Sequence, residues 1–166
     1  MEDILARADK DREQCLTVGY SHYDAAEMAE GRSKLFGVPT IVTSTVVGTA
    51  IFSTIDSSPA FEWRVVAGFL SLLAAVFSGL QTFFRFSELA ESHKAAGASY
   101  GALRRQLDIF ELRYSAAGDA ARGEALGELE KIAARLADLA GTSPKVSAKL
   151  HSATVKRLRE HRDFRV

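Results

Sequence analysis

Residues 35–55 read LFGVPTIVTSTVVGTAIFSTI, and residues 65–84 read VVAGFLSLLAAVFSGLQTFF. These two stretches contain no charged residue over 21 and 20 positions, and a polar segment over 56–64 lies between them. At 1.5 Å per residue, each stretch forms a helix of roughly 30 Å, which matches the hydrocarbon core of a bilayer. We therefore predict two transmembrane helices joined by a short polar loop. The alternative is a pair of buried helices in a soluble bundle, but such helices rarely lack both a charge and a polar face over this length.

The overall composition hides these two stretches. Hydrophobic residues make up 47% of the chain, charged residues make up 25%, and the formal net charge is zero, as in an ordinary soluble domain. Because acidic and basic residues alternate along the chain, we expect no nucleic-acid polymer as a partner. The single cysteine, Cys15, allows no internal disulfide and fits a reducing cytoplasmic setting.

Basic residues on either side of the two spans predict their orientation. Arg32 and Lys34 precede the first span and Arg85 follows the second, whereas the loop between the spans holds only Arg64 beside acidic residues. Cytoplasmic loops carry the excess of lysine and arginine in membrane proteins. Both termini are therefore expected in the cytoplasm.

Small residues collect on one face of each predicted span. On the second span they fall within about 100° of arc and bulky residues cover the opposite side, so we predict that the small face packs against the first span and the bulky face contacts lipid. The residues assigned to helix packing are Gly48, Gly68, Ser71, Ala75 and Gly79.

Hydroxyl residues form a second stripe on the first span. Thr45, Thr49 and Ser53 lie roughly opposite the small face and are our pore-lining candidates, with the competing possibility that each hydroxyl bonds to its own i−4 carbonyl. A lone hairpin cannot enclose a water path, so a pore requires a homo-oligomer. The candidates for a hydrophobic gate are Val42, Val46 and Phe52.

Apolar residues continue after the second span at alternating steps of three and four, which is the pattern of a coiled-coil seam. Because no helix stop signal follows Phe84, we expect the second span to continue as one long helix into a cytoplasmic stalk. We interpret His22 and His93 as packing residues, since no cysteine or second histidine stands at ligand spacing. The seam residues are Phe86, Leu89, His93, Tyr100, Leu103, Leu107 and Phe110.

The remaining residues predict further cytoplasmic helices. Residues 115–123 indicate a turn, an apolar-faced helix then ends at Gly141, and Ser143 with Pro144 indicates the N-cap and first turn of a last basic helix. The expected fold is an all-α membrane protein with a two-helix transmembrane hairpin, a long continuous second helix and a cytoplasmic helical bundle. Its segments are an N-terminal cytoplasmic helix over 1–34, the hairpin over 35–84 with spans of about 35–55 and 65–84, and the stalk with C-terminal helices over 85–166.

Motifs of enzyme chemistry are missing from the sequence. We find no phosphate-binding glycine loop, no nucleophile elbow and no zinc-ligand spacing. The two spans also contain no carboxylate that would relay protons or ions. We therefore expect neither an enzyme nor a cofactor or metal.

Three stretches of the sequence resemble one known family. Residues 22–52, HYDAAEMAEGRSKLFGVPTIVTSTVVGTAIF, residues 79–108, GLQTFFRFSELAESHKAAGASYGALRRQLD, and residues 143–146, SPKV, resemble the SLATT family of two-span bacterial membrane proteins. The resemblance implies an oligomeric pore-forming effector in the inner membrane, used in anti-phage or conflict systems and triggered by a nucleotide signal. It also implies a separately encoded nucleotide second-messenger synthase or sensor as a partner. A non-conducting membrane-anchored scaffold or regulatory subunit is the alternative.

Overall fold

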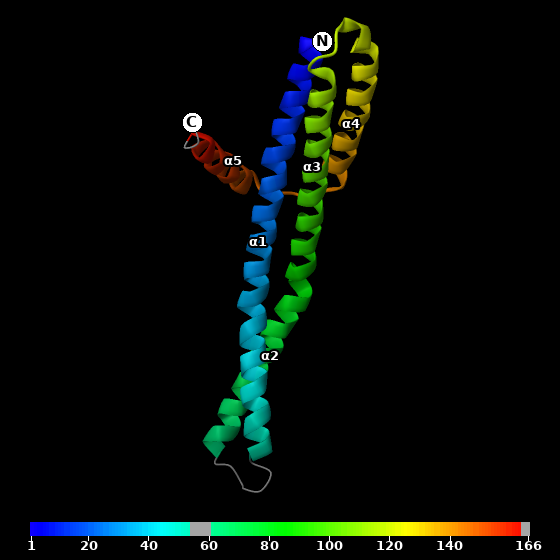
Figure 1. Ribbon diagram of the computed structural model, residues 1–166. Helices are drawn as coiled ribbons and strands as arrows, with labels where there is room; N and C mark the ends of the chain where they lie inside the picture. The colour runs from blue at the N-terminus through cyan, green and yellow to red at the C-terminus, as the bar shows by residue number, and fades with distance from the viewer. Residues whose placement is uncertain (54–60, 164–166) are drawn as a thin grey trace. The chain divides into compact units, whose positions relative to one another are not determined.

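The chain is helical along the part that the structure describes. The computed structural model describes residues 1–53 and 61–163, and within those residues it contains α-helices and one short 3-10 helix but no strand. The all-α prediction is thereby confirmed. In chain order the elements are α1 (Glu2–Ser53), α2 (Phe61–Phe84), α3 (Phe86–Tyr114), η1 (Asp119–Ala121), α4 (Arg122–Thr142) and α5 (Ala148–Asp163), as Figure 1 shows.

Contacts within the chain group it into two compact units. Unit 1 comprises Met1–Glu27 and Leu89–Val166, and unit 2 comprises Met28–Glu88. The helix α1 is continuous over 52 residues and contributes to both units. Most of the predicted loop over 56–64 lies outside the described residues.

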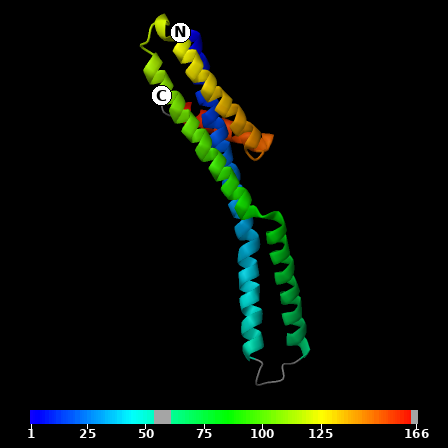
Figure 2. The same cartoon turned by 90° about the vertical axis from the view of Figure 1, so that its right-hand side faces the viewer.

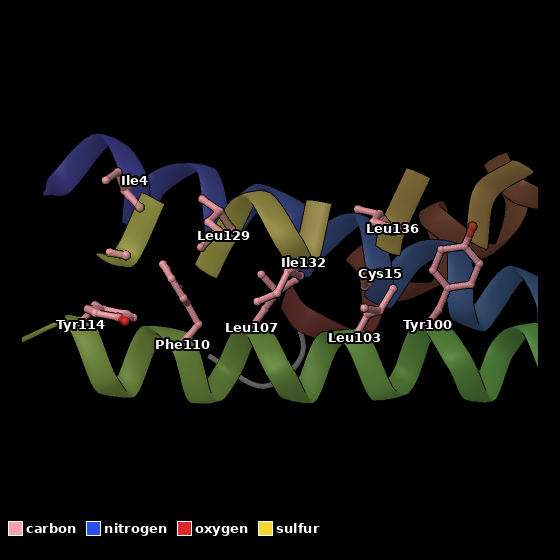
Figure 3. Close-up of a cluster of buried hydrophobic side chains, with 12 residues drawn as sticks. Ile4, Cys15, Tyr100, Leu103, Leu107, Phe110, Tyr114, Leu129, Ile132 and Leu136 are labelled. Carbon is pink, nitrogen blue, oxygen red and sulfur yellow. The ribbon is translucent and has the colours of Figure 1, made fainter. Parts of the chain in front are cut away.

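Unit 1 is built around an apolar core to which α1, α3 and α4 all contribute. Figure 3 shows Leu107 and Phe110 of α3 directed toward residues of α1 and α4. The three-and-four spacing of apolar residues places them on one side of each helix, so the three sides meet. The core residues are Ile4, Ala8, Cys15, Tyr100, Leu103, Leu107, Phe110, Tyr114, Ala125, Leu129, Ile132 and Leu136.

Ion pairs surround this core on the surface of unit 1. Arg12 of α1 lies 3.5 Å from the Asp108 carboxylate and 3.6 Å from that of Glu111, both on α3. Arg122, at the start of α4, makes a bidentate pair with Asp3, with its shortest contact at 2.6 Å. Exposed pairs such as these contribute little stability, so burial of the apolar core supplies most of it.

In unit 2, α1 continues through Pro39 without interruption. Proline has no backbone N–H, so this turn of the helix lacks one i−4 hydrogen bond. The hydroxyl of Thr43 donates to the Pro39 carbonyl at 2.7 Å, and the hydroxyl of Thr40 donates to the Phe36 carbonyl at 2.9 Å. The predicted entry of the first span is thus helical on both sides of the proline.

We predicted one continuous helix from the second span into the stalk. This prediction is wrong, because the helix breaks at one residue. Arg85 has a φ of 45° and separates α2 from α3, a break that Figure 2 also shows. This left-handed conformation is unfavourable for a residue with a Cβ. Stacked rings stabilise the break: Phe86 lies 5.1 Å from Phe84 and 5.7 Å from Phe36, measured between ring centroids.

The predicted start of the last helix is also corrected. Ser143 ends α4, with its N–H donating to the Leu139 carbonyl and an extended ψ of 145°, because the ring of Pro144 disfavours helical geometry in the residue before it. The side chain of Ser147 instead accepts the N–H of Leu150 at 3.3 Å. Ser147 is therefore the N-cap, and α5 begins at Ala148.

Candidate functional site

The outer surface of α2 is apolar. Within the described residues, one helical stretch is long and apolar enough to span a membrane. This stretch, Val65–Tyr114, runs from α2 through the break at Arg85 into α3 and contains a window with a mean hydropathy of 1.8, of which no residue is buried. Leu72 is 63% exposed and Phe83 is 80% exposed. A surface of exposed large apolar side chains is typical of an interaction site, where a lipid phase or another protein covers it.

Within unit 2, α1 and α2 contact each other through bulky and polar side chains. The rings of Phe36 and Phe77 lie 6.4 Å apart between centroids. The Gln81 amide nitrogen lies 3.3 Å from the point where a Cβ on Gly37 would stand, so glycine allows this close approach. Leu73, Phe77 and Leu80 are half-buried.

The small residues that we assigned to helix packing are placed differently from the prediction. A Cβ built on Gly48, Gly68 or Gly79 would meet no atom within 4 Å, and Ser71 and Ala75 are exposed. The prediction that this stripe packs on the first span of the same chain is therefore wrong, because the bulky side of α2 takes that place. Packing of the stripe against a helix of another chain stays a prediction.

The pore-lining candidates are exposed and bonded to their own helix. The Thr45 hydroxyl donates to the Ile41 carbonyl at 2.8 Å, and the Thr49 hydroxyl donates to the Thr45 carbonyl at 2.9 Å. A hydroxyl with this internal bond still offers its oxygen lone pairs to water. Both threonines therefore remain available to a water path. The side chain of Ser53 lies outside the described residues.

Two of the gate candidates are also on the exposed surface. Val42 and Val46 have about half of their side-chain surface exposed in the single chain. Phe52 has its side chain outside the described residues. One chain therefore leaves the two valines uncovered, and a role in closing a pore requires further copies of the chain around the same axis.

The stalk seam is buried within the chain. Six of its residues are buried, and one, Leu89, is 41% exposed while its neighbour Ala90 takes the buried position. This burial means that the seam packs against other helices of the same chain, and it does not remain free for a second copy. The seam therefore offers no support for the predicted homo-oligomer. The buried residues are Phe86, His93, Tyr100, Leu103, Leu107 and Phe110.

Unit 1 brings together two histidines that are 71 residues apart. His22 of α1 and His93 of α3 are both buried, and their Nδ1 atoms lie 2.9 Å apart. Tyr100 stacks on His22 with ring centroids 5.5 Å apart. Burial, helped by the neighbouring His93, lowers the pKa of His22 to about 4, and burial lowers the pKa of His93. Both rings are therefore neutral at pH 7.

The sequence contained a weak signal for this pairing. Gly19 lies three residues before His22, and Gly97 lies four residues after His93, which is the mirrored order expected of antiparallel neighbours. The Gly97 Cβ position would lie only 3.2 Å from the Gly19 carbonyl oxygen, so both glycines are needed where α1 and α3 meet. We interpreted each histidine separately and missed the pair.

Polar contacts attach α5 to α1. The Asp24 carboxylate accepts the Thr154 hydroxyl at 2.5 Å and the Arg157 guanidinium at 2.8 and 2.9 Å. Ser21 donates its hydroxyl proton to the Thr17 carbonyl, so its oxygen accepts a proton from His151 Nδ1, 2.8 Å away. A mainly polar attachment of this kind is easier to release than a packed apolar core.

The Cys15 thiol of unit 1 is buried and is not set up as a nucleophile. Burial raises the pKa of the Cys15 thiol to about 11, which suppresses the nucleophilic thiolate. In the described part of the chain, no group of three or more metal-binding side chains comes together.

Comparison with models of known families, with curated proteins and with solved structures found no match for this chain.

Proposed function

We propose that this chain is a two-span protein of the bacterial inner membrane, with both termini in the cytoplasm, that assembles into a pore-forming effector. The charge-free stretches 35–55 and 65–84 are the proposed spans, and unit 1 is the proposed cytoplasmic part. The distribution of lysine and arginine supports this orientation. The family resemblance supports a role in anti-phage or conflict systems, with a nucleotide signal as the trigger.

The observation that carries the proposal is the uncovered apolar surface of α2. A core helix of a soluble protein has most of its apolar residues buried, whereas none of the apolar window in Val65–Tyr114 is buried. Each large apolar side chain kept in water forgoes about 1.5–3 kcal/mol of burial. A lipid environment removes this penalty without changing the fold of the chain.

The pore is the part of the proposal that requires assembly. The exposed hydroxyls of Thr45 and Thr49 and the exposed stripe around Gly68 and Gly79 are separate surfaces of unit 2. In a ring of subunits, the small stripe would pack against a neighbouring helix and the hydroxyls would face a central path. A path lined by hydroxyls, without rings of charge, would discriminate poorly among small ions.

The first experiment measures the mass of the assembly. The full chain is solubilised in mild detergent, and its mass is determined by light scattering and compared with crosslinking in native membranes. We expect a defined oligomer in both. A monomer in both settings would overturn the pore, and the exposed surface of α2 would then have lipid as its only cover.

The second experiment identifies the helix that lines the path. In a Cys15→Ala background, single cysteines at Thr45, Thr49 or Ser53 are treated with a water-soluble thiol reagent during current recording from planar bilayers. Block of the current at these positions supports the proposed lining. Block from Ser71 or Ser78 instead assigns the path to α2, and a chain that inserts and assembles but never conducts is the non-conducting scaffold.

A further inference from the structure

The His22–His93 contact joins two helices in the interior of unit 1. His22 is 2% exposed and His93 is 4% exposed, and their ring centroids are 5.2 Å apart. The Nδ1–Nδ1 distance of 2.9 Å is that of a hydrogen bond. Two lone pairs or two N–H groups cannot face each other at this distance. The contact therefore contains one proton between the two Nδ1 atoms.

This single proton fixes the chemical state of each ring. One histidine carries its proton on Nδ1 and donates it, and the other accepts it and carries its own proton on Nε2. The two neutral rings are thus different tautomers. One further proton, added to the bare Nε2 of the donor ring, makes an imidazolium that still donates through Nδ1, so the contact persists. A second further proton places N–H against N–H and breaks the contact.

The surrounding backbone leaves the rings little room to separate. The Cβ position on Gly97 would lie 3.1 Å from the ring of Tyr23 and 3.2 Å from the Gly19 carbonyl oxygen. Tyr100 covers one face of His22 in a stacked arrangement. Repulsion between two imidazolium rings is therefore relieved only if α1 and α3 move apart at this level.

The groups around the pair do not stabilise a positive charge on it. On α1, the Asp24 carboxylate is bound to Thr154 and Arg157 of α5. On α3, Tyr100 stacks on His22, and Glu91 and Lys94 are exposed. On α5, His151 directs its Nδ1 to Ser21. The causes that lower the pKa of His22 are burial and then His93, and for His93 the cause is burial.

We infer that the His22–His93 contact is a proton-sensitive connection between α1 and α3, which persists with no or one added proton and opens when both rings are protonated. This property belongs to unit 1 and does not depend on the proposed pore. Acidification of the solution around unit 1 is the signal that it detects.

The direction of the pH effect follows from the sign of the shift. The pKa of His22 is lower in the folded protein than the ordinary value of 6.5, so the unfolded chain binds the proton more readily. The stability contribution is complete above pH 6.5 and is lost as the pH falls toward 4. For His22 alone, the unfolding equilibrium constant is expected to rise about a hundredfold between pH 7 and pH 4.

The direct experiment is a nitrogen-15 NMR titration of the histidine side chains in the full chain, in nanodiscs of zwitterionic lipid. We expect one ring protonated at Nδ1 and the other at Nε2 at pH 7, with both titrating below the ordinary value of 6.5. Free imidazole in the same buffer serves as the reference. Two identical tautomers, or titration of both rings at the pH of free imidazole, would overturn the inference.

A variant tests the consequence for stability. The double substitution His22→Gln and His93→Gln removes both titrating groups, and the control is His161→Gln. Thermal unfolding at pH 7 and pH 4.5 should show a smaller acid-induced loss of Tm for the double variant than for the control. An equal loss in both would contradict the inference, and the NMR titration provides the decision if the double variant does not fold.

Discussion

Unit 1 buries large apolar side chains that unit 2 exposes. In unit 1, Leu107 and Phe110 are fully buried and charged residues occupy the outer surface. In unit 2, Ile41 and Leu72 are about two-thirds exposed, and the apolar stretches carry no charge. Hydrophobicity alone therefore does not define a core. Under the proposed function, this difference reflects two surroundings, water for unit 1 and lipid for unit 2.

The largest expected effect tests the core of unit 1. Phe110→Ala removes a fully buried ring and leaves a cavity, so we expect a loss of about 3–5 kcal/mol in the free energy of unfolding of unit 1. Cys15, the single cysteine, is 1% exposed, so its labelling by a thiol reagent in increasing urea reports the opening of this unit.

The matched control is Phe83→Ala in unit 2, where the ring is exposed and no core collapses. We expect the urea midpoint of Cys15 labelling to stay at the value of the unmodified chain. Equal shifts from the two substitutions would remove the distinction between a packed unit and one that exposes its apolar side chains.

The second prediction concerns the surface of α2. Leu72→Arg places a charge in the middle of the proposed second span, and we expect a penalty of about 2.5–3.5 kcal/mol on insertion. The control is Leu126→Arg on α4, which is a leucine of unit 1 with similar partial exposure. Extraction of membranes at alkaline pH should release a much larger fraction of the Leu72→Arg protein. If both variants remain inserted, the apolar surface of α2 is covered by protein and not by lipid.

The third prediction tests the attachment of α5. Asp24→Asn weakens the contacts to Thr154 and Arg157, and with Arg157 half-exposed we expect a loss of about 1–2 kcal/mol. Amide hydrogens of α5 should then exchange about five to thirty times faster. Lys156→Gln, which removes only an exposed pair with Glu160, is the control and should leave the exchange rates unchanged. Unchanged rates in the Asp24 variant would show that apolar contacts hold α5.

Periodicity predicted the helices and the buried side of the stalk. The repeat of apolar residues from Phe86 to Phe110 identified six buried side chains, because a helix must turn one side to its neighbours. Periodicity could not choose between Leu89 and Ala90, which are adjacent in sequence. The direction from which the neighbouring helix arrives decides that choice, and it depends on the whole of unit 1.

The errors have a common physical origin in contacts between distant residues. Neither a glycine nor a proline stands at the break at Arg85, so the local sequence does not predict it. The break is stabilised by Phe36, which is distant in the sequence. Phe36 and Gly37 of α1 determine which face of α2 packs against α1. The small residues of α2 alone therefore could not predict that face. The His22–His93 pair likewise depends on the register between α1 and α3, which one helix alone does not contain.

The smallest expected effect separates two threonines that look equivalent in sequence. The Thr154 hydroxyl of unit 1 lies 2.5 Å from the Asp24 carboxylate on another helix and 3.0 Å from the Leu150 carbonyl of its own helix, whereas the Thr49 hydroxyl of unit 2 bonds within its own helix, to the Thr45 carbonyl. We therefore expect Thr154→Val to destabilise unit 1 by about 1 kcal/mol, and Thr49→Val to change stability and insertion by less than about 0.5 kcal/mol. Urea titration of Cys15 labelling and alkaline extraction measure the two quantities. Because the proposed pore places the Thr49 hydroxyl toward water, Thr49→Val should still reduce the single-channel current in planar bilayers by removing a polar group from the path. A current equal to that of the unmodified chain, in a variant that inserts and assembles normally, would exclude Thr49 from the pore lining.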